Sequence, residues 1–293
     1  MIMVKDKNKK LDKTDQAYHK LSKFKQICYQ KLLPSKETKS YDKKAKQISK
    51  NDALLMLEMD IDYDADKNRF FKDDQQISLE SIKKCARSSQ FFDDISANDM
   101  ADFFIFCTQT PTHALDHPVG KKIFENCKQL KHEYLVKIEP MLFYRARILN
   151  EDELPYVEDE MRKAPFGISP QGRFNNTGRG VFYLTDSSKA AKLEVLKHSN
   201  NLDKIQIAQF KNKETLFMID IRDWNNDFAK YCLSPIKQQK TINKPYIIPN
   251  FFSDCLKRCN IDGIIYTNKE KQNLYAFFDD HHFICVKPAY QII

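Results

Sequence analysis

The stretch from Gly172 to His198, GRFNNTGRGVFYLTDSSKAAKLEVLKH, contains side chains that could do chemistry together. Arg173 lies in a polar loop, Tyr183 lies in a short apolar strand, and Glu194 lies on the helix that follows. Ala190, Ala191 and Glu194 share one face of that helix by their i, i+3 and i+4 spacing. Two alanines allow this face to approach a sheet, so the Glu194 carboxylate is expected on the interior side, where it needs a partner.

Arginines supply the candidate partners for this carboxylate. Arg145 and Arg147 lie two residues apart in a predicted strand, so they share a face but differ in depth along it. A purely structural salt bridge from Glu194 to Arg145, Arg147 or Arg173 is one interpretation. The other is a site for an anionic ligand, because the guanidinium fork pairs with two oxygens of a phosphate.

Glycine usage restricts how phosphates can be bound. The chain has only six glycines, and no GxGxxG or GxxxxGK[ST] motif can be built from them. Rossmann and P-loop binding are therefore excluded as sequence hypotheses. Side chains such as the arginines would have to hold any phosphate.

Four segments together resemble a known family. They are FYRAR (143–147), GRFNN (172–176), VFYLTDSSKAAKLEV (181–195) and DGIIYTN (262–268), and the step from Tyr183 to Glu194 is the most specific part. In order and spacing the chain is similar to RES-domain proteins, which are named for their Arg, Glu and Ser residues.

This resemblance implies an activity, a fold and partners. RES domains are NAD-consuming toxins, usually paired with an Xre-type antitoxin, and their fold is similar to that of diphtheria-toxin-like ADP-ribosyltransferases. Members cleave the nicotinamide–ribose bond by hydrolysis or phosphorolysis, and at least one type ADP-ribosylates a protein. We therefore expect NAD as substrate, inorganic phosphate as a conceivable co-substrate, no other cofactor, and an Xre-type antitoxin or a protein acceptor of ADP-ribose as partner.

The resemblance also implies a set of site residues. The catalytic residues would be Glu194, Arg145 and Tyr183, the NAD-binding residues would be Arg173, Asn175, Tyr246 and Asn250, and no metal is expected. Glu194 would stabilise oxocarbenium character on the ribose, the two arginines would clamp the pyrophosphate or a phosphate ion, and Tyr183 would stack on nicotinamide. A core aromatic at a strand end is the structural alternative for Tyr183.

One departure from the family pattern concerns its serine. The family serine lies near the start of the last helix, but here that region reads KPYIIPNFF (244–252), with isoleucine or proline at the hydroxyl position. Ser253 and Thr267 are the nearest hydroxyl side chains. This departure disfavours phosphorolysis and favours water or a protein side chain as acceptor.

Charge and periodicity divide the chain into three parts. Residues 1–50 carry fifteen lysines against five acidic residues, while the remainder is nearly neutral. The first part is predicted to be a flexible, Lys-rich arm, with nucleic-acid contact disfavoured because it lacks arginine and has few aromatics. Residues 51–135 are predicted to be a helical extension, with helix starts at Ser96 and Pro118.

Residues 136–293 are predicted to be an α+β, mixed-sheet, ADP-ribosyltransferase-like RES catalytic domain. Helices are expected over residues 188–198 and 250–259, the second ending at Asn260. The expected strands are 141–148, 181–185, 215–221, 262–267, 274–278 and 283–290.

Compartment and cysteine usage complete the expectations. The N-terminus shows no signal-peptide pattern, and no run of 18 apolar residues could span a membrane, so we expect a cytoplasmic protein or a translocated effector. Eight scattered cysteines without a CxxC pair indicate mostly buried thiols. A zinc site at Cys255 and Cys259 with His281 and His282 is a weak alternative.

Three functional hypotheses remain at this point. The leading one is an NAD glycohydrolase or phosphorylase that acts as a bacterial toxin or effector. A protein mono-ADP-ribosyltransferase is the second. The third is a non-catalytic binding module on the same fold, which the missing serine motivates.

Overall fold

The computed structural model describes residues 61–64, 69–72, 75–77, 88–149, 154–197, 204–234 and 244–292. The chain forms two compact units, Met1–Lys83 and Lys84–Ile293. The predicted arm, residues 1–50, and the apolar stretch Ala53–Met59 lie outside the described residues.

The described part of the first unit is a small antiparallel sheet. Its strands are β1 (Asp62–Asp64), β2 (Arg69–Lys72) and β3 (Gln75–Ile77), in that order. The helical prediction for residues 51–135 is therefore wrong for these strands. Tyr63, Phe70 and Phe71 are good strand formers that alternate with short polar runs, and this composition favours hairpins over a helix.

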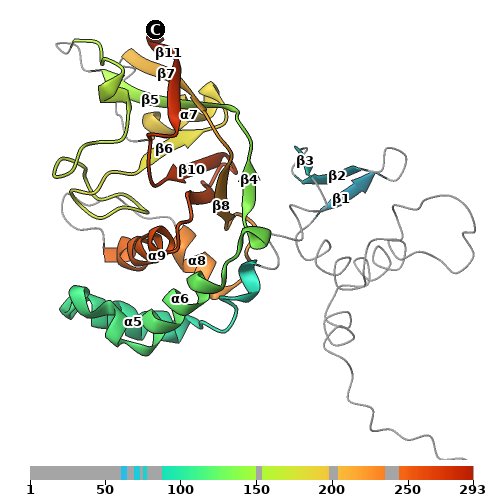
Figure 1. Cartoon of the computed structure of the whole chain (residues 1–293), viewed down its shortest axis with the longest axis vertical. Helices are drawn as coiled ribbons and strands as arrows, with labels where there is room; N and C mark the ends of the chain where they lie inside the picture. The colour runs from blue at the N-terminus through green and yellow to red at the C-terminus, as the bar shows by residue number, and fades with distance from the viewer. Residues whose placement is uncertain are drawn as a thin grey trace, which may run out of the picture. The chain divides into compact units, whose positions relative to one another are not determined.

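The second unit is built on an eight-stranded sheet with the order β11-β7-β5-β6-β10-β9-β8-β4 (Figure 1). Its strands are β4 (Val136–Ile138), β5 (Leu142–Leu149), β6 (Phe182–Thr185), β7 (Lys204–Asn212), β8 (Leu216–Asp220), β9 (Gly263–Thr267), β10 (Asn273–Phe277) and β11 (Phe283–Ile292). Neighbours pair antiparallel except β8 and β9, which are parallel. The α+β class with a mixed sheet is thus confirmed.

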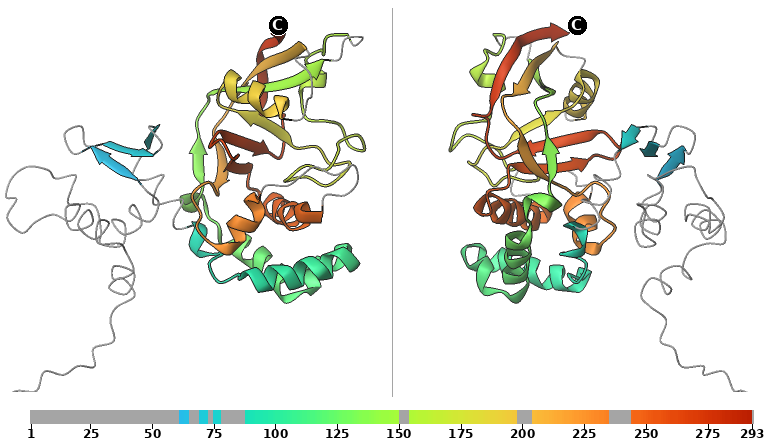
Figure 2. Two further views of the ribbon diagram at one scale, coloured as in Figure 1. Left: turned by 180° about the vertical axis from the view of Figure 1, so that it is seen from behind. Right: turned by 45° about the vertical axis from the view of Figure 1, so that its right-hand side comes forward.

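Four helices gather together at one side of this sheet (Figure 2). They are α5 (Ala97–Gln109), α6 (Pro118–Gln129), α8 (Asp227–Leu233) and α9 (Ile247–Arg258). Two helix starts agree with the sequence: Ser96 and Asp99 form a capping box on α5, and Pro118 occupies the first turn of α6. None of the described helices has the length and apolar character needed to cross a membrane.

The predicted boundary at residue 135 differs from the observed one at Lys84. Aromatic rings explain the difference, because they join the predicted extension to the predicted catalytic domain. Phe103 of α5 contacts Phe251 of α9 edge to face with ring centroids 5.2 Å apart, and Phe92 contacts Phe252 at 5.4 Å. Burial of such rings against a neighbouring helix favours one shared core over two separate ones.

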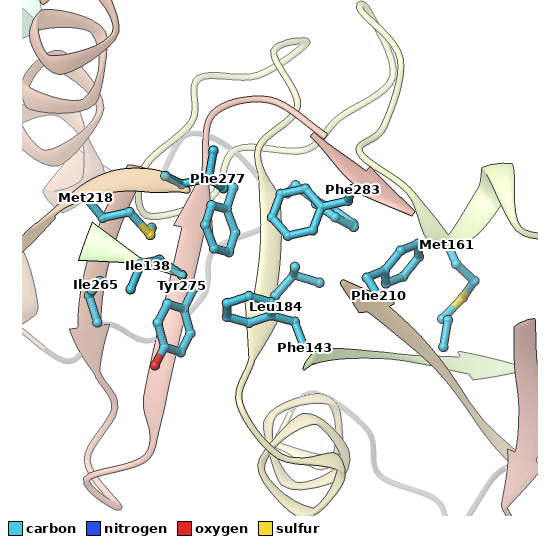
Figure 3. Close-up of a cluster of buried hydrophobic side chains, with 13 residues drawn as sticks. Ile138, Phe143, Met161, Leu184, Phe210, Met218, Ile265, Tyr275, Phe277 and Phe283 are labelled. Atoms are coloured by element: carbon cyan, nitrogen blue, oxygen red, sulfur yellow. The ribbon is translucent and has the colours of Figure 1, made fainter. Parts of the chain in front are cut away.

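The central core lies between the strands and the loop before β6. Phe143, Phe182, Phe210 and Phe277 are at most 1% exposed in it, and Figure 3 shows Phe143, Tyr275, Phe277 and Phe283 turned toward one another. Interlocked aromatic side chains from β5, β6, β7, β10 and β11 hold these strands in fixed register. The sheet can therefore hold the side chains of its strands in fixed positions.

Helix α7 (Ser188–Leu196) packs on the sheet through the face that the sequence predicts. Ser187 caps its N-terminus, where the hydroxyl accepts a hydrogen bond from the Ala190 amide at 3.2 Å. Ala191 packs with Ala146, Ile205 and Ile207 in a small buried cluster. Because Ala191 is small, the helix lies close to β5 and β7, and Glu194 on the same face is brought near residues of β5 and β6.

Candidate active site

A cavity of about 1050 Å³ opens between β5, β6 and α7. Its origin is a divergence of strands: β5 pairs with β7 along its whole length, but it pairs with β6 only where Tyr144 lies opposite Thr185. Beyond this pair the two strands separate, and Arg145 and Tyr183 line the space between them. The volume lies near the upper end of the range of about 300–1,000 Å³ for ligand sites.

The cavity brings together five of the seven predicted site residues. They are Arg145, Arg173, Tyr183, Glu194 and Tyr246. Asn175 and Asn250 do not line it. Four basic and two acidic side chains line the cavity, namely Arg145, Arg173, Lys197, Lys269, Glu194 and Glu270. The excess of positive charge suits an anionic ligand.

Arg145 is a half-buried cation that is tied to the backbone. Its Nη1 donates a hydrogen bond to the carbonyl oxygen of Arg162 at 2.9 Å, and its guanidinium lies 5.4 Å from the centre of the Phe182 ring. Burial, with a further contribution from the charge of Arg147, lowers the pKa of Arg145 to about 9. The group is therefore still a cation at neutral pH. Arg147 does not line the cavity, and its guanidinium lies over Tyr156 at 5.3 Å.

Arg173 also lines the cavity and is held by the backbone at the end of α8. Its Nη1 donates to the carbonyl oxygens of Cys232 at 2.6 Å and Ser234 at 3.0 Å. The guanidinium lies 5.4 Å from the ring centre of Tyr246, a contact of cation–π type. Among the described residues its Nε and Nη2 have no hydrogen-bond acceptor, so these donors are available to a ligand in the cavity.

Tyr183 lines the cavity together with the two arginines and is fixed through its hydroxyl. The hydroxyl accepts from the Phe174 amide at 2.9 Å and donates to Oδ1 of Asn175 at 2.9 Å. Burial raises the pKa of Tyr183, so the phenol stays neutral. Asn175 also donates to the Pro170 carbonyl oxygen at 2.8 Å. It therefore lies behind Tyr183 and holds that ring in place, and the NAD-binding role predicted for Asn175 is untested.

Glu194 reaches the cavity from α7, as its helix face predicts. Its Oε2 accepts from Nζ of Lys197 at 3.0 Å and from Nδ2 of Asn268 at 3.0 Å. The structural interpretation, a salt bridge to Arg145, Arg147 or Arg173, is wrong in its partner: the ion pair is with Lys197. Two groups of lining residues can therefore be distinguished by their contacts: the arginine wall (Arg145, Arg173 and Tyr183) and the carboxylate wall (Glu194, Lys197 and Asn268).

Three polar residues near the start of α9 and the end of β9 differ in location. Asn250 is 1% exposed, and its side-chain amide has no hydrogen-bond partner among the residues that the structure describes. Ser253 is also buried, and its hydroxyl donates to the Phe174 carbonyl oxygen at 2.7 Å. Of the two nearest hydroxyl residues, only Thr267 lines the cavity. The roles predicted for Asn250 and for a family-type serine remain predictions.

Sequence reasoning missed Lys197 and Asn268 as members of the site. Lys197 follows the last residue of α7, and Asn268 is the last residue of the DGIIYTN segment. Their position one helical turn after Glu194 and directly after a buried strand was an available signal.

The described residues contain no group of three or more His, Cys, Asp and Glu side chains that could hold a metal ion. Six of the cysteines lie in the described part of the chain as free thiols, and four of these are buried. Cys255 and Cys259 lie one turn apart on and just after α9, as predicted, but they do not meet His281 and His282 in a metal-ligand group there.

A search of curated protein sequences gave no match. Among solved structures, a chain in the crystal structure of the M. tuberculosis MbcT–MbcA toxin–antitoxin complex is similar over 53% of this chain and 86% of that chain, with 12% identity and a TM-score of 0.34. The RES domain model matches residues 143–290, half of the chain, and this range contains every predicted site residue. The chain therefore belongs to the RES-domain family.

Proposed function

We propose that this protein cleaves the nicotinamide–ribose bond of NAD in the cavity between β5, β6 and α7. The observation that carries the proposal is the lining of the cavity, in which the arginine wall and the carboxylate wall, with Glu194, occur together. NAD has the complementary arrangement of groups, with an anionic pyrophosphate near a ribose that becomes positively charged as the bond breaks.

Each wall has a role in this reaction. The free guanidinium donors of Arg173 and the cation of Arg145 bind the pyrophosphate oxygens. The Glu194 carboxylate lies beside the anomeric carbon and stabilises the oxocarbenium-like transition state. Tyr183 offers a fixed aromatic face to the nicotinamide ring. The bond electrons leave with nicotinamide, which departs as a neutral molecule, and a nucleophile adds to the anomeric carbon.

Water is the acceptor that we favour. Ser253, one of the two hydroxyl candidates, is buried and hydrogen-bonded away from the cavity, so it is not available to orient a phosphate ion. The half-open cavity leaves room for water beside Glu194. A toxin role, an Xre-type antitoxin, a protein acceptor and a cytoplasmic or translocated location remain predictions from the family.

Product identification tests this proposal. Purified full-length protein is incubated with NAD in phosphate-free buffer and in buffer with added phosphate, and the products are separated and weighed by mass spectrometry. We expect nicotinamide and ADP-ribose in both buffers. ADP-ribose 1″-phosphate in the second buffer would indicate phosphorolysis instead, and a mass increase on the protein would indicate self-ADP-ribosylation. Unchanged NAD with folded protein would contradict the proposal.

A further inference from the structure

The Glu194 carboxylate is held on one oxygen only. Lys197 and Asn268 both donate to Oε2, each at 3.0 Å. Among the described residues no donor contacts Oε1. The side chain is 35% exposed, and at such exposure an unrestrained glutamate samples several rotamers. Two donors on one oxygen select a single orientation and leave the other oxygen for a ligand.

Asn268 has its orientation fixed independently of Glu194. Its Nδ2 also donates to Oε1 of Gln272 at 2.7 Å, and its Oδ1 accepts from the backbone amides of Glu270 at 3.1 Å and Gln272 at 3.0 Å. These bonds close the turn between β9 and β10, in which Lys271 has a positive φ of 56°. The amide that contacts Glu194 is therefore preorganised by its own turn.

Lys197 is the second donor and is itself held by two carboxylates. It forms an ion pair with Glu194 and another with Glu270 from the same turn. Burial alone would lower the pKa of Lys197, but its hydrogen bonds to Glu270 and Glu194 outweigh this and raise it. The lysine is thus a permanent cation that links the end of α7 to the β9–β10 turn.

We propose that Lys197 and Asn268 are positioning residues that hold Glu194 with Oε1 directed at the reacting ribose. The proposal rests on the proposed NAD cleavage and adds two residues to its machinery. Neither side chain touches the substrate in this role. Both act through the carboxylate, and Arg145 and Arg173 bind NAD without them. Their loss should therefore affect turnover and leave substrate binding nearly unchanged.

Steady-state kinetics of nicotinamide release test this claim in the full-length chain. We expect Asn268→Ala and Lys197→Met each to lower kcat by about tenfold or more while KM changes by less than about twofold, because a preorganised electrostatic group is misplaced. Asn268→Asp should lower kcat further, since it replaces a donor with a second carboxylate. Lys197→Arg should restore kcat to within about threefold of wild type, because the charged donor is retained.

Lys189→Met is the matched control, because Lys189 is exposed on the same helix and does not line the cavity. It should behave as wild type. If Glu194→Gln abolishes turnover but Lys197→Met and Asn268→Ala keep wild-type kcat, the positioning roles are wrong and the proposed function stands. A change in KM alone, or failure of Lys197→Arg to rescue, also overturns the positioning roles. A wild-type protein that releases no nicotinamide overturns the proposed function together with this inference.

Discussion

The two walls of the cavity hold their charged groups in different ways. On the arginine wall, Arg145 and Arg173 donate to backbone carbonyl oxygens, and Tyr183 is bonded to a backbone amide. On the carboxylate wall, Glu194 is held by the side chains of Lys197 and Asn268. A point mutation cannot remove a backbone partner, whereas it can remove a side-chain partner such as Lys197 or Asn268.

Because of this difference, variants of the two walls should affect the stability of the fold and the turnover of NAD to different extents. A change on the arginine wall leaves buried backbone groups unpaired, so it should affect both folding and NAD binding. A change on the carboxylate wall removes partly exposed groups and should affect turnover with little cost in stability. The following variants test that division.

Glu194→Gln should have the largest effect on activity. The change keeps the shape of the side chain and removes the charge that an oxocarbenium-like transition state requires. We expect kcat to fall by at least about 100-fold, equivalent to about 3 kcal/mol, with the thermal midpoint unchanged. A variant that retained more than about a tenth of wild-type turnover would make Glu194 a structural residue.

Arg145→Ala should have the next largest effect, and on KM more than on kcat. Removal of a charged hydrogen-bond donor to a ligand typically costs about 1.5–3 kcal/mol, or roughly 10- to 100-fold in binding. Arg147→Ala is the control two residues along β5, because Arg147 does not line the cavity. Isothermal titration with NAD measures both variants. Equal losses for the two would show that Arg145 has no special access to the ligand.

Tyr183→Phe should lower the stability of the fold, because the Tyr183 hydroxyl bonds to two groups beside the cavity. The variant leaves the Phe174 amide and the Asn175 side chain without their shared partner, at a cost of about 1–3 kcal/mol in the free energy of unfolding. Tyr246→Phe is the control, because Tyr246 lines the same cavity and its hydroxyl has no hydrogen bond among the described residues. Urea unfolding measures both. Equal stability of the two variants would show that the Tyr183 hydroxyl does not stabilise the fold.

Removal of residues 1–50 should have the smallest effect. The predicted site residues all lie within 143–290, and the compact unit that contains them begins at Lys84. We expect the 51–293 protein to turn over NAD within about twofold of the full chain, a difference too small to count as lost transition-state stabilisation. A protein of residues 136–293 should lose solubility instead, because it exposes Phe251 and Phe252 where α5 and the preceding segment pack. A 51–293 protein that folds but does not cleave NAD would show that residues 1–50 are needed for activity.

Five of the seven predicted residues line the cavity, and the sequence signals that predicted them are local. Helix α7 and its buried face follow from the Ser187 cap, the two alanines and the spacing to Glu194. Strand β5, on which α7 packs, follows from the apolar pattern around Arg145. Asn260 ends α9 with a left-handed φ of 57°, as a C-terminal asparagine predicts. These features depend only on residues close together in the chain.

Features that depend on distant contacts were missed. Strand β7 reads KIQIAQFKN and was not predicted, although it is a long strand that pairs with both β11 and β5. The hydrogen bond from Asn268 to Glu194 joins two segments that are 74 residues apart. The small sheet of β1 to β3 was predicted to be helical. In each case tertiary packing or strand pairing decided the outcome, and local propensity alone does not report it.

The most direct test of the account is the time course of nicotinamide release from NAD by the full-length protein. Proton NMR separates free nicotinamide from NAD, so wild type and Glu194→Gln can be followed side by side with folding checked by circular dichroism. If the protein cleaves NAD through Glu194, we expect steady release of nicotinamide by wild type and almost none by the folded variant. Absence of release by folded wild-type protein, or equal release by both proteins, would contradict it.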